Sequence, residues 1–120
     1  MHALIIEDDY LIGLSIEDAL RELGFRSFSF ARSEDAAISS ARDRHPDLIT
    51  ADVRLLPGSG VRAVGAICTD RQCVVIFVTG FAAELTDEVP NATVVQKPFD
   101  KAGFNEAVSR ALSGSAKDVR

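Results

Sequence analysis

Five polar residues of this sequence are of the types that carry out phosphoryl and metal chemistry, and each follows a short apolar run. Asp8 and Asp9 follow the first run, Asp52 a later one, and Thr79 and Lys97 two more. If the acids lie together, two unit charges 4 Å apart repel by about 4 kcal/mol at an effective dielectric of 20. A shared proton or a bound hard cation would relieve that repulsion.

The donor types indicate which cation and which reaction fit such a cluster. Oxygen ligands favour Mg²⁺ or Ca²⁺, and a half-open acid cluster suits Mg²⁺, which accepts a phosphate as a further ligand. Lys97 and Thr79 offer a phosphoryl group a positive charge and a hydrogen-bond donor. Asp52 could then act as a nucleophile and form an acyl phosphate.

Periodicity indicates the elements that would position these residues. Strands are predicted over 3–6, 27–30, 48–51, 74–78 and 93–95, the second at a sheet edge. Amphipathic helices are predicted over 12–23, between Ser33 and Pro46, over 61–68, briefly around 82–87, and from Asp100 to Gly114. Ser33 and Asp100 are expected to cap helices, and Gly24 and Gly114 to end them.

Five strand–helix units in strict alternation predict an α/β fold, an open parallel sheet with helices on both faces. In such sheets, functional groups gather at the carboxyl ends of the strands. Asp8, Asp9, Asp52, Thr79 and Lys97 all follow strand ends, so we expect them around one crevice. Glu7, which precedes the two acids at the same strand end, is expected to be a bystander rather than a metal ligand.

Composition limits the other possibilities. The 120 residues suit one domain, and the net charge of −5 disfavours a nucleic-acid binder. No apolar run approaches the roughly 20 residues that span a membrane, and the N-terminus does not resemble a signal peptide. Cys68 and Cys73 lack zinc-site spacing, so we expect reduced thiols in the cytoplasm. His2 and His45 are expected at the surface.

The motifs Asp8-Asp9, Asp52, Thr79 and Lys97-Pro98-Phe99, each at a strand end and in this order, resemble the receiver domain of bacterial two-component response regulators. The resemblance implies a CheY/flavodoxin-like (βα)5 fold with strand order 2-1-3-4-5. It covers essentially the whole chain, with a receiver domain over residues 1–114 and a polar tail over 115–120.

The same resemblance implies a magnesium site and a phosphorylation site. Asp52 is expected to accept a phosphoryl group from a phosphohistidine on a sensor kinase. Asp9 and Asp52 are expected to bind Mg²⁺ directly, together with the backbone carbonyl of Arg54, and Asp8 to bind through a water molecule.

Other residues are implied to contact the phosphoryl group. Lys97 would pair with its oxygens, and the Lys97–Pro98 bond is expected to be cis. Thr79 would turn its hydroxyl inward on phosphorylation, and Gly80 would leave room for the phosphoryl group beside the backbone.

Three features depart from the usual receiver pattern. The loop proline is Pro57, five residues beyond Asp52 rather than four, and Val94 stands where an aromatic switch residue is usual. The segment between Thr79 and Val94 is short, which predicts a shortened fourth helix. The run Phe77-Val78-Thr79-Gly80-Phe81 is similar to the Phe-Ala-Thr-Gly-x-Tyr signature of an atypical receiver subfamily, which also lacks the aromatic switch. Phe81 could be a packing residue or part of a substitute switch.

The expected partners are a sensor histidine kinase or phosphotransfer protein and a downstream protein, with no direct binding of nucleic acid or membrane. A role as a phosphate sink is also open, as is a monomer or a phosphorylation-dependent dimer. We expect no enzymatic activity beyond the domain's own phosphorylation and dephosphorylation. The main alternative is a degenerate receiver that binds partners without phosphorylation. A flavin-binding domain is disfavoured by the acids after the first strand, and a phosphohydrolase by Arg54 where a general acid is needed.

Overall fold

The computed structural model describes residues 1–55, 58–83 and 92–118. Strands and helices alternate along the chain: β1 (His2–Ile6), α1 (Tyr10–Glu22), β2 (Ser27–Ala31), α2 (Glu34–Asp43), β3 (Leu48–Ala51), α3 (Gly60–Ile67), β4 (Val75–Thr79), β5 (Thr93–Gln96) and α5 (Lys101–Asp118). All the strands pair in parallel, in the order β2-β1-β3-β4-β5, which confirms the predicted fold. Pro57 and most of the predicted fourth helix lie outside the described residues.

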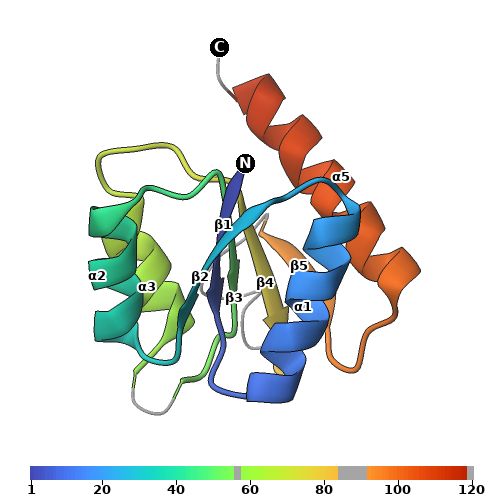
Figure 1. Cartoon of the computed structure of the whole chain (residues 1–120), viewed down its shortest axis with the longest axis horizontal. Helices are drawn as coiled ribbons and strands as arrows, with labels where there is room; N and C mark the ends of the chain where they lie inside the picture. Colours follow the sequence, from blue (N-terminus) through green and yellow to red (C-terminus); the bar gives the residue numbers. More distant parts are fainter. Residues whose placement is uncertain (56–57, 84–91, 119–120) are drawn as a thin grey trace.

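Helices cover both faces of the sheet, with α1 and α5 on one side and α2 and α3 on the other (Figure 1). Successive residues of a strand point to opposite faces. In β1, Ile5 therefore packs into the cluster that contains Leu20 of α1 and Phe104 of α5. Its neighbour Ile6 packs into the second cluster, which contains Ala63 of α3. Burial on both faces explains why the central strands are short, mostly apolar runs.

Most of the predicted helix ends are confirmed. The Ser33 side chain accepts the Ala36 N–H at 3.2 Å, and Asp100 Oδ1 accepts the Gly103 N–H at 2.7 Å. Gly24 follows α1 with φ of +103°, in the left-handed region. The prediction for Gly114 was wrong, because α5 continues to Asp118. A glycine within a helix costs only about 1 kcal/mol, which the neighbouring turns can offset.

Two predictions about isolated side chains were also wrong. His2 is 3% exposed, and its ring nitrogens lie 2.7 Å and 2.9 Å from the hydroxyls of Ser27 and Ser29. The pairing of β1 with β2 creates this environment. Cys68 and Cys73 are joined by a disulfide, because the turn between α3 and β4 brings their Cα atoms to 5.8 Å.

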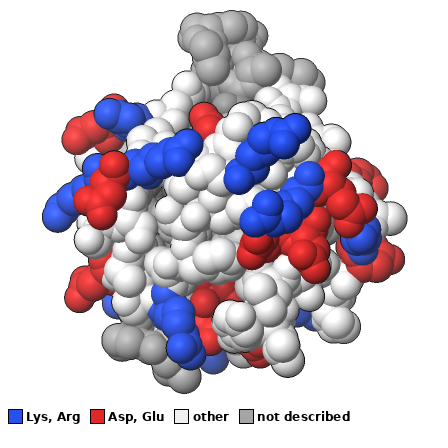
Figure 2. Space-filling view, viewed as in Figure 1, with Lys and Arg blue, Asp and Glu red and all other residues white. Residues whose placement is uncertain are grey.

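The surface carries charges of both signs. On the face drawn in Figure 2, basic and acidic side chains are interspersed. Within the described residues, none of the helices is long and apolar enough to cross a membrane.

Candidate functional site

The carboxyl end of β3 presents Asp52 beside the end of β1. The Asp52 N–H donates to the Ile6 carbonyl at 3.0 Å, which extends the pairing of the two strands by one residue. The residue is only 8% exposed. Asp52 is therefore a carboxylate at a fixed backbone position, with its side chain largely removed from solvent.

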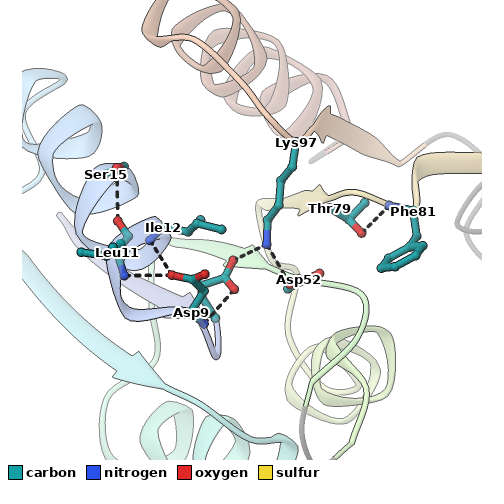
Figure 3. A network of polar contacts seen from close by, with 9 residues as sticks. Asp9, Leu11, Ile12, Ser15, Asp52, Thr79, Phe81 and Lys97 are labelled. Atoms are coloured by element: carbon teal, nitrogen blue, oxygen red, sulfur yellow. Dashed lines mark hydrogen bonds and ion pairs between the residues drawn. The ribbon is translucent and has the colours of Figure 1, made fainter.

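Lys97 supplies the positive charge that balances this acid. The residue directly follows β5, and its Nζ lies 2.9 Å from Asp52 Oδ2 and 2.9 Å from Glu7 Oε1 (Figure 3). Burial opposes the charge on Lys97, but the contacts with Asp52 and Glu7 outweigh it and raise the pKa of the ammonium. The Lys97–Pro98 peptide bond is cis, as expected.

Glu7 is an unexpected member of the site. Its side chain is 2% exposed, and burial raises its pKa to about 7 against the lowering effect of Lys97 and of the Asp9 N–H. Its buried Oε1 has an ion-pair contact with Lys97 but no partner in hydrogen-bond geometry. The prediction that Glu7 is a bystander was therefore wrong, because its carboxylate pairs with Lys97.

The three carboxylates that approach one another are those of Glu7, Asp8 and Asp52. One oxygen from each lies within 4.8 Å of the others. Asp9, expected as a direct ligand, is outside this group within the described residues. Its Oδ1 accepts the N–H groups of Leu11 and Ile12 at 3.0 Å and 3.2 Å, so Asp9 caps α1 (Figure 3).

The carboxylate group fits a hard divalent cation. Three acids converge within 4.8 Å, and Lys97 contacts two of them, Glu7 and Asp52. The single positive charge of Lys97 does not balance three carboxylates, and a divalent cation would offset the remaining repulsion. The set consists only of oxygen donors, which favours Mg²⁺ over zinc.

Thr79 is the last residue of β4, which pairs with β3 on the side opposite β1. The residue is 0% exposed, and its hydroxyl oxygen accepts the Phe81 N–H at 3.0 Å (Figure 3). The Gly80 carbonyl accepts a bond from Gln96 Nε2 at 3.1 Å, and a Cβ added to Gly80 would meet no atom within 4 Å. The open space at Gly80 is compatible with the role expected for it.

Arg54 lies in the loop after β3. Its backbone forms an isolated antiparallel bridge with Ser59, and its guanidinium lies over the Phe81 ring, 3.9 Å from the centroid. The loop is also held from α2, because Glu34 Oε1 accepts the Ser59 N–H at 3.0 Å. That contact is the largest cause that lowers the pKa of Glu34.

Gly60 is a structural residue of the site that sequence reasoning missed. Its N–H donates to the Val53 carbonyl at 3.0 Å, and a Cβ at this position would lie 1.7 Å from the Asp52 carbonyl oxygen. The sequence contains a signal for it, since Gly58 and Gly60 together mark a turn after the third predicted strand.

Comparison with known proteins places these features in a family. The model of the response regulator receiver domain matches residues 3–109. The receiver domain of PhyR from Erythrobacter litoralis is 34% identical with a TM-score of 0.86, covering 93% of this chain and 89% of that chain. PhyR from Brucella abortus is 34% identical with a TM-score of 0.89, covering 98% of this chain and 49% of that chain.

A curated relative gives a more distant match. The transcriptional regulatory protein PdtaR of Mycobacterium tuberculosis is 28% identical over 114 residues, which is 92% of this chain and 56% of that protein. The chain thus spans about half the length of PdtaR and of the PhyR chain from Brucella abortus. The family match over most of its length and the shared fold show that the chain belongs to the response regulator receiver domain family.

Proposed function

We propose that this receiver domain accepts a phosphoryl group on Asp52 in a Mg²⁺-dependent reaction. The observation that carries the proposal is the placement of Asp52 Oδ2 2.9 Å from Lys97 Nζ, within a group of three converging carboxylates. An Asp52 oxygen bonds to phosphorus as the bond from phosphorus to the donor's leaving atom breaks. The Lys97 ammonium offsets the charge that the phosphoryl oxygens bring, and Thr79 can donate its hydroxyl to one of them.

The acids Glu7, Asp8 and Asp52 would hold the metal ion, with the backbone carbonyl of Arg54 as a further ligand. Mg²⁺ would supply positive charge opposite the phosphoryl oxygens. In this assignment Asp8 takes the place expected for Asp9, because Asp9 already accepts two backbone N–H groups as the cap of α1.

A phosphohistidine on a sensor kinase or on a phosphotransfer protein is the donor that we propose, in the cytoplasm. The phosphoryl group leaves a histidine nitrogen, and the imidazole retains the electron pair of the broken bond. Phosphorylation then alters contacts with a downstream protein, or the domain acts as a phosphate sink. We also propose membership of the atypical Phe-Ala-Thr-Gly-x-Tyr subfamily, and we propose no turnover of a separate substrate.

Labelling with acetyl phosphate tests this function directly. With Mg²⁺ present, we expect an acid-labile phosphate on the wild-type protein and none on Asp52→Asn. Asp43→Asn, in which an aspartate at the end of α2 is changed in the same way, is the matched control and should be labelled normally. Label that persists on Asp52→Asn at another residue would refute the assignment. A folded wild-type protein without label would support the degenerate receiver instead.

The metal ligands are tested by NMR titration with Mg²⁺ alone. Asp8→Asn should weaken Mg²⁺ binding about tenfold or more, since loss of even an outer-shell partner costs 10- to 100-fold. Asp9→Asn should bind Mg²⁺ with nearly the wild-type affinity, because asparagine also caps helices well. A larger loss of Mg²⁺ affinity in Asp9→Asn than in Asp8→Asn would show that Asp9, and not Asp8, binds the metal ion.

A further inference from the structure

Phe81 is held by two contacts, one through its backbone and one through its ring. Its N–H donates to the Thr79 hydroxyl at 3.0 Å. The Arg54 guanidinium lies over one face of its ring, 3.9 Å from the centroid. Phe81 is nevertheless 43% exposed. The ring is thus attached through one contact to the end of β4 and through the other to the loop after β3.

Both groups that hold Phe81 begin next to the proposed phosphoacceptor. Arg54 is two residues after Asp52, which limits the distance between their Cα atoms to about 7 Å. Thr79 ends β4, the strand that pairs with β3, and its side chain is fully buried. The cation and the hydroxyl that contact Phe81 are therefore anchored to β3, whose end carries Asp52, and to β4, which pairs with it.

We propose that Arg54 is a second cationic ligand of the phosphoryl group, and that its departure from Phe81 releases the ring as the signal of phosphorylation. The inference rests on the proposed phosphorylation of Asp52. We call the arrangement of Arg54, Thr79 and Phe81 the Phe81 clamp.

The relative strengths of the contacts give the direction of the change. A guanidinium bound to phosphoryl oxygens forms charge-assisted hydrogen bonds, about twice as strong as neutral ones, and it can bind two oxygens at once. Its contact with an exposed aromatic ring is weaker. The Thr79 hydroxyl likewise gains a charged acceptor when it turns away from the Phe81 N–H. Both changes loosen Phe81, and neither strengthens its attachment.

The clamp would also supply what position 94 lacks. Val94 is a short aliphatic residue that packs against the α2–α3 side of the core, so it has no aromatic ring to relocate. Phe81 is aromatic, partly exposed and linked to Thr79 through its own backbone. Its release would change the surface beside the site without any movement of β5.

A single tryptophan can report on this ring, because the chain contains none. Phe81→Trp preserves the contact with Arg54, since indole is the best partner for a cation. Quenching of its fluorescence by acrylamide is measured in Mg²⁺, with and without beryllofluoride. We expect quenching to increase with beryllofluoride. NMR shifts near Thr79 in the same samples show whether beryllofluoride has bound.

Variants of Arg54 separate the clamp from the phosphorylation that it rests on. In Phe81→Trp with Arg54→Gln, quenching should already be higher without beryllofluoride, with the ratio of released to covered ring raised about two- to fivefold. Beryllofluoride should then add little. Arg42→Gln is the matched control, because Arg42 is an exposed arginine in the last turn of α2, away from the loop that carries Arg54. It should behave like Phe81→Trp alone.

Two results would overturn the clamp. Equal quenching of the Arg54→Gln and parent proteins without beryllofluoride would show that Arg54 does not cover the ring, whatever the phosphorylation chemistry. Bound beryllofluoride with unchanged quenching of the parent would show that the ring is not released. Failure of acetyl phosphate to label Asp52 would instead remove the proposed function, and the release step with it.

Discussion

The replacement of Gly60 by alanine tests how strictly the loop after β3 must pack against Asp52. An added Cβ would lie 1.7 Å from the Asp52 carbonyl oxygen and 2.9 Å from its carbonyl carbon, both backbone atoms that no rotamer change can move. Separation to normal contact requires a shift of more than 1 Å. That shift would break the 3.0 Å bond from the Gly60 N–H to Val53.

The expected cost follows from these two effects. Overpacking costs about 1–3 kcal/mol, and a lost backbone hydrogen bond about 0.5–1.5 kcal/mol. We therefore expect Gly60→Ala to lower the free energy of unfolding by about 2–4 kcal/mol, measured by urea denaturation. The label from acetyl phosphate should also form more slowly, because Asp52 shares the displaced backbone.

A second glycine of the same helix provides the control. A Cβ added to Gly65 would meet no atom within 4 Å, so Gly65→Ala should raise the free energy of unfolding by about 0.5–1 kcal/mol and leave labelling unchanged. The packing argument would be refuted if Gly60→Ala lay within about 0.5 kcal/mol of wild type and was labelled at the wild-type rate.

Two further predictions concern the parts of the molecule away from the site. Burial, followed by Arg44, lowers the pKa of His2, so below the ordinary value of 6.5 the unfolded chain binds a proton that the folded chain resists. The free energy of unfolding should therefore fall as the pH is lowered below about 6.5, by up to about 1.4 kcal/mol per pH unit, and this component should vanish in His2→Gln. Urea denaturation of both proteins at pH 7.5 and 5.5 measures it, and a difference between the two proteins that is the same at both pH values would contradict it. The Cys68–Cys73 disulfide spans five positions, and its loss through Cys68→Ser/Cys73→Ser should cost about 2 kcal/mol. A reductant should lower the free energy of unfolding of the wild-type protein to that of the double variant and leave the double variant unchanged. Equal free energies of unfolding of the two proteins without reductant would show that the disulfide does not stabilise the fold.

The strand ends could be predicted from the sequence because burial on both faces leaves short, mostly apolar runs such as Leu48–Ala51. Asp52 is the first charged residue after this run and therefore marks the carboxyl end of the strand. The helix caps at Ser33 and Asp100 were also predictable, since they depend on residues within one turn.

The choice among Glu7, Asp8 and Asp9 depends on where the chain turns from β1 into α1, which composition does not specify. In the structure, Asp9 begins the helix, and the two preceding acids remain at the sheet edge. His2 illustrates the same limit. Its partners Ser27 and Ser29 become visible only once the register of β1 against β2 is known.

Lys97 alone does not balance the negative charge of the site, before or after phosphorylation. With all groups ionised, Glu7, Asp8 and Asp52 carry three negative charges and Lys97 one positive charge. The net charge of the four side chains is then about −2, which one divalent cation would cancel. Conversion of Asp52 to an acyl phosphate dianion would then add one further negative charge. That added charge has to attract a cation from nearby, and Arg54 already lies at the edge of the site, on the ring of Phe81. A neutral resting site thus makes the position of Arg54 sensitive to phosphorylation, and Phe81 would respond with it.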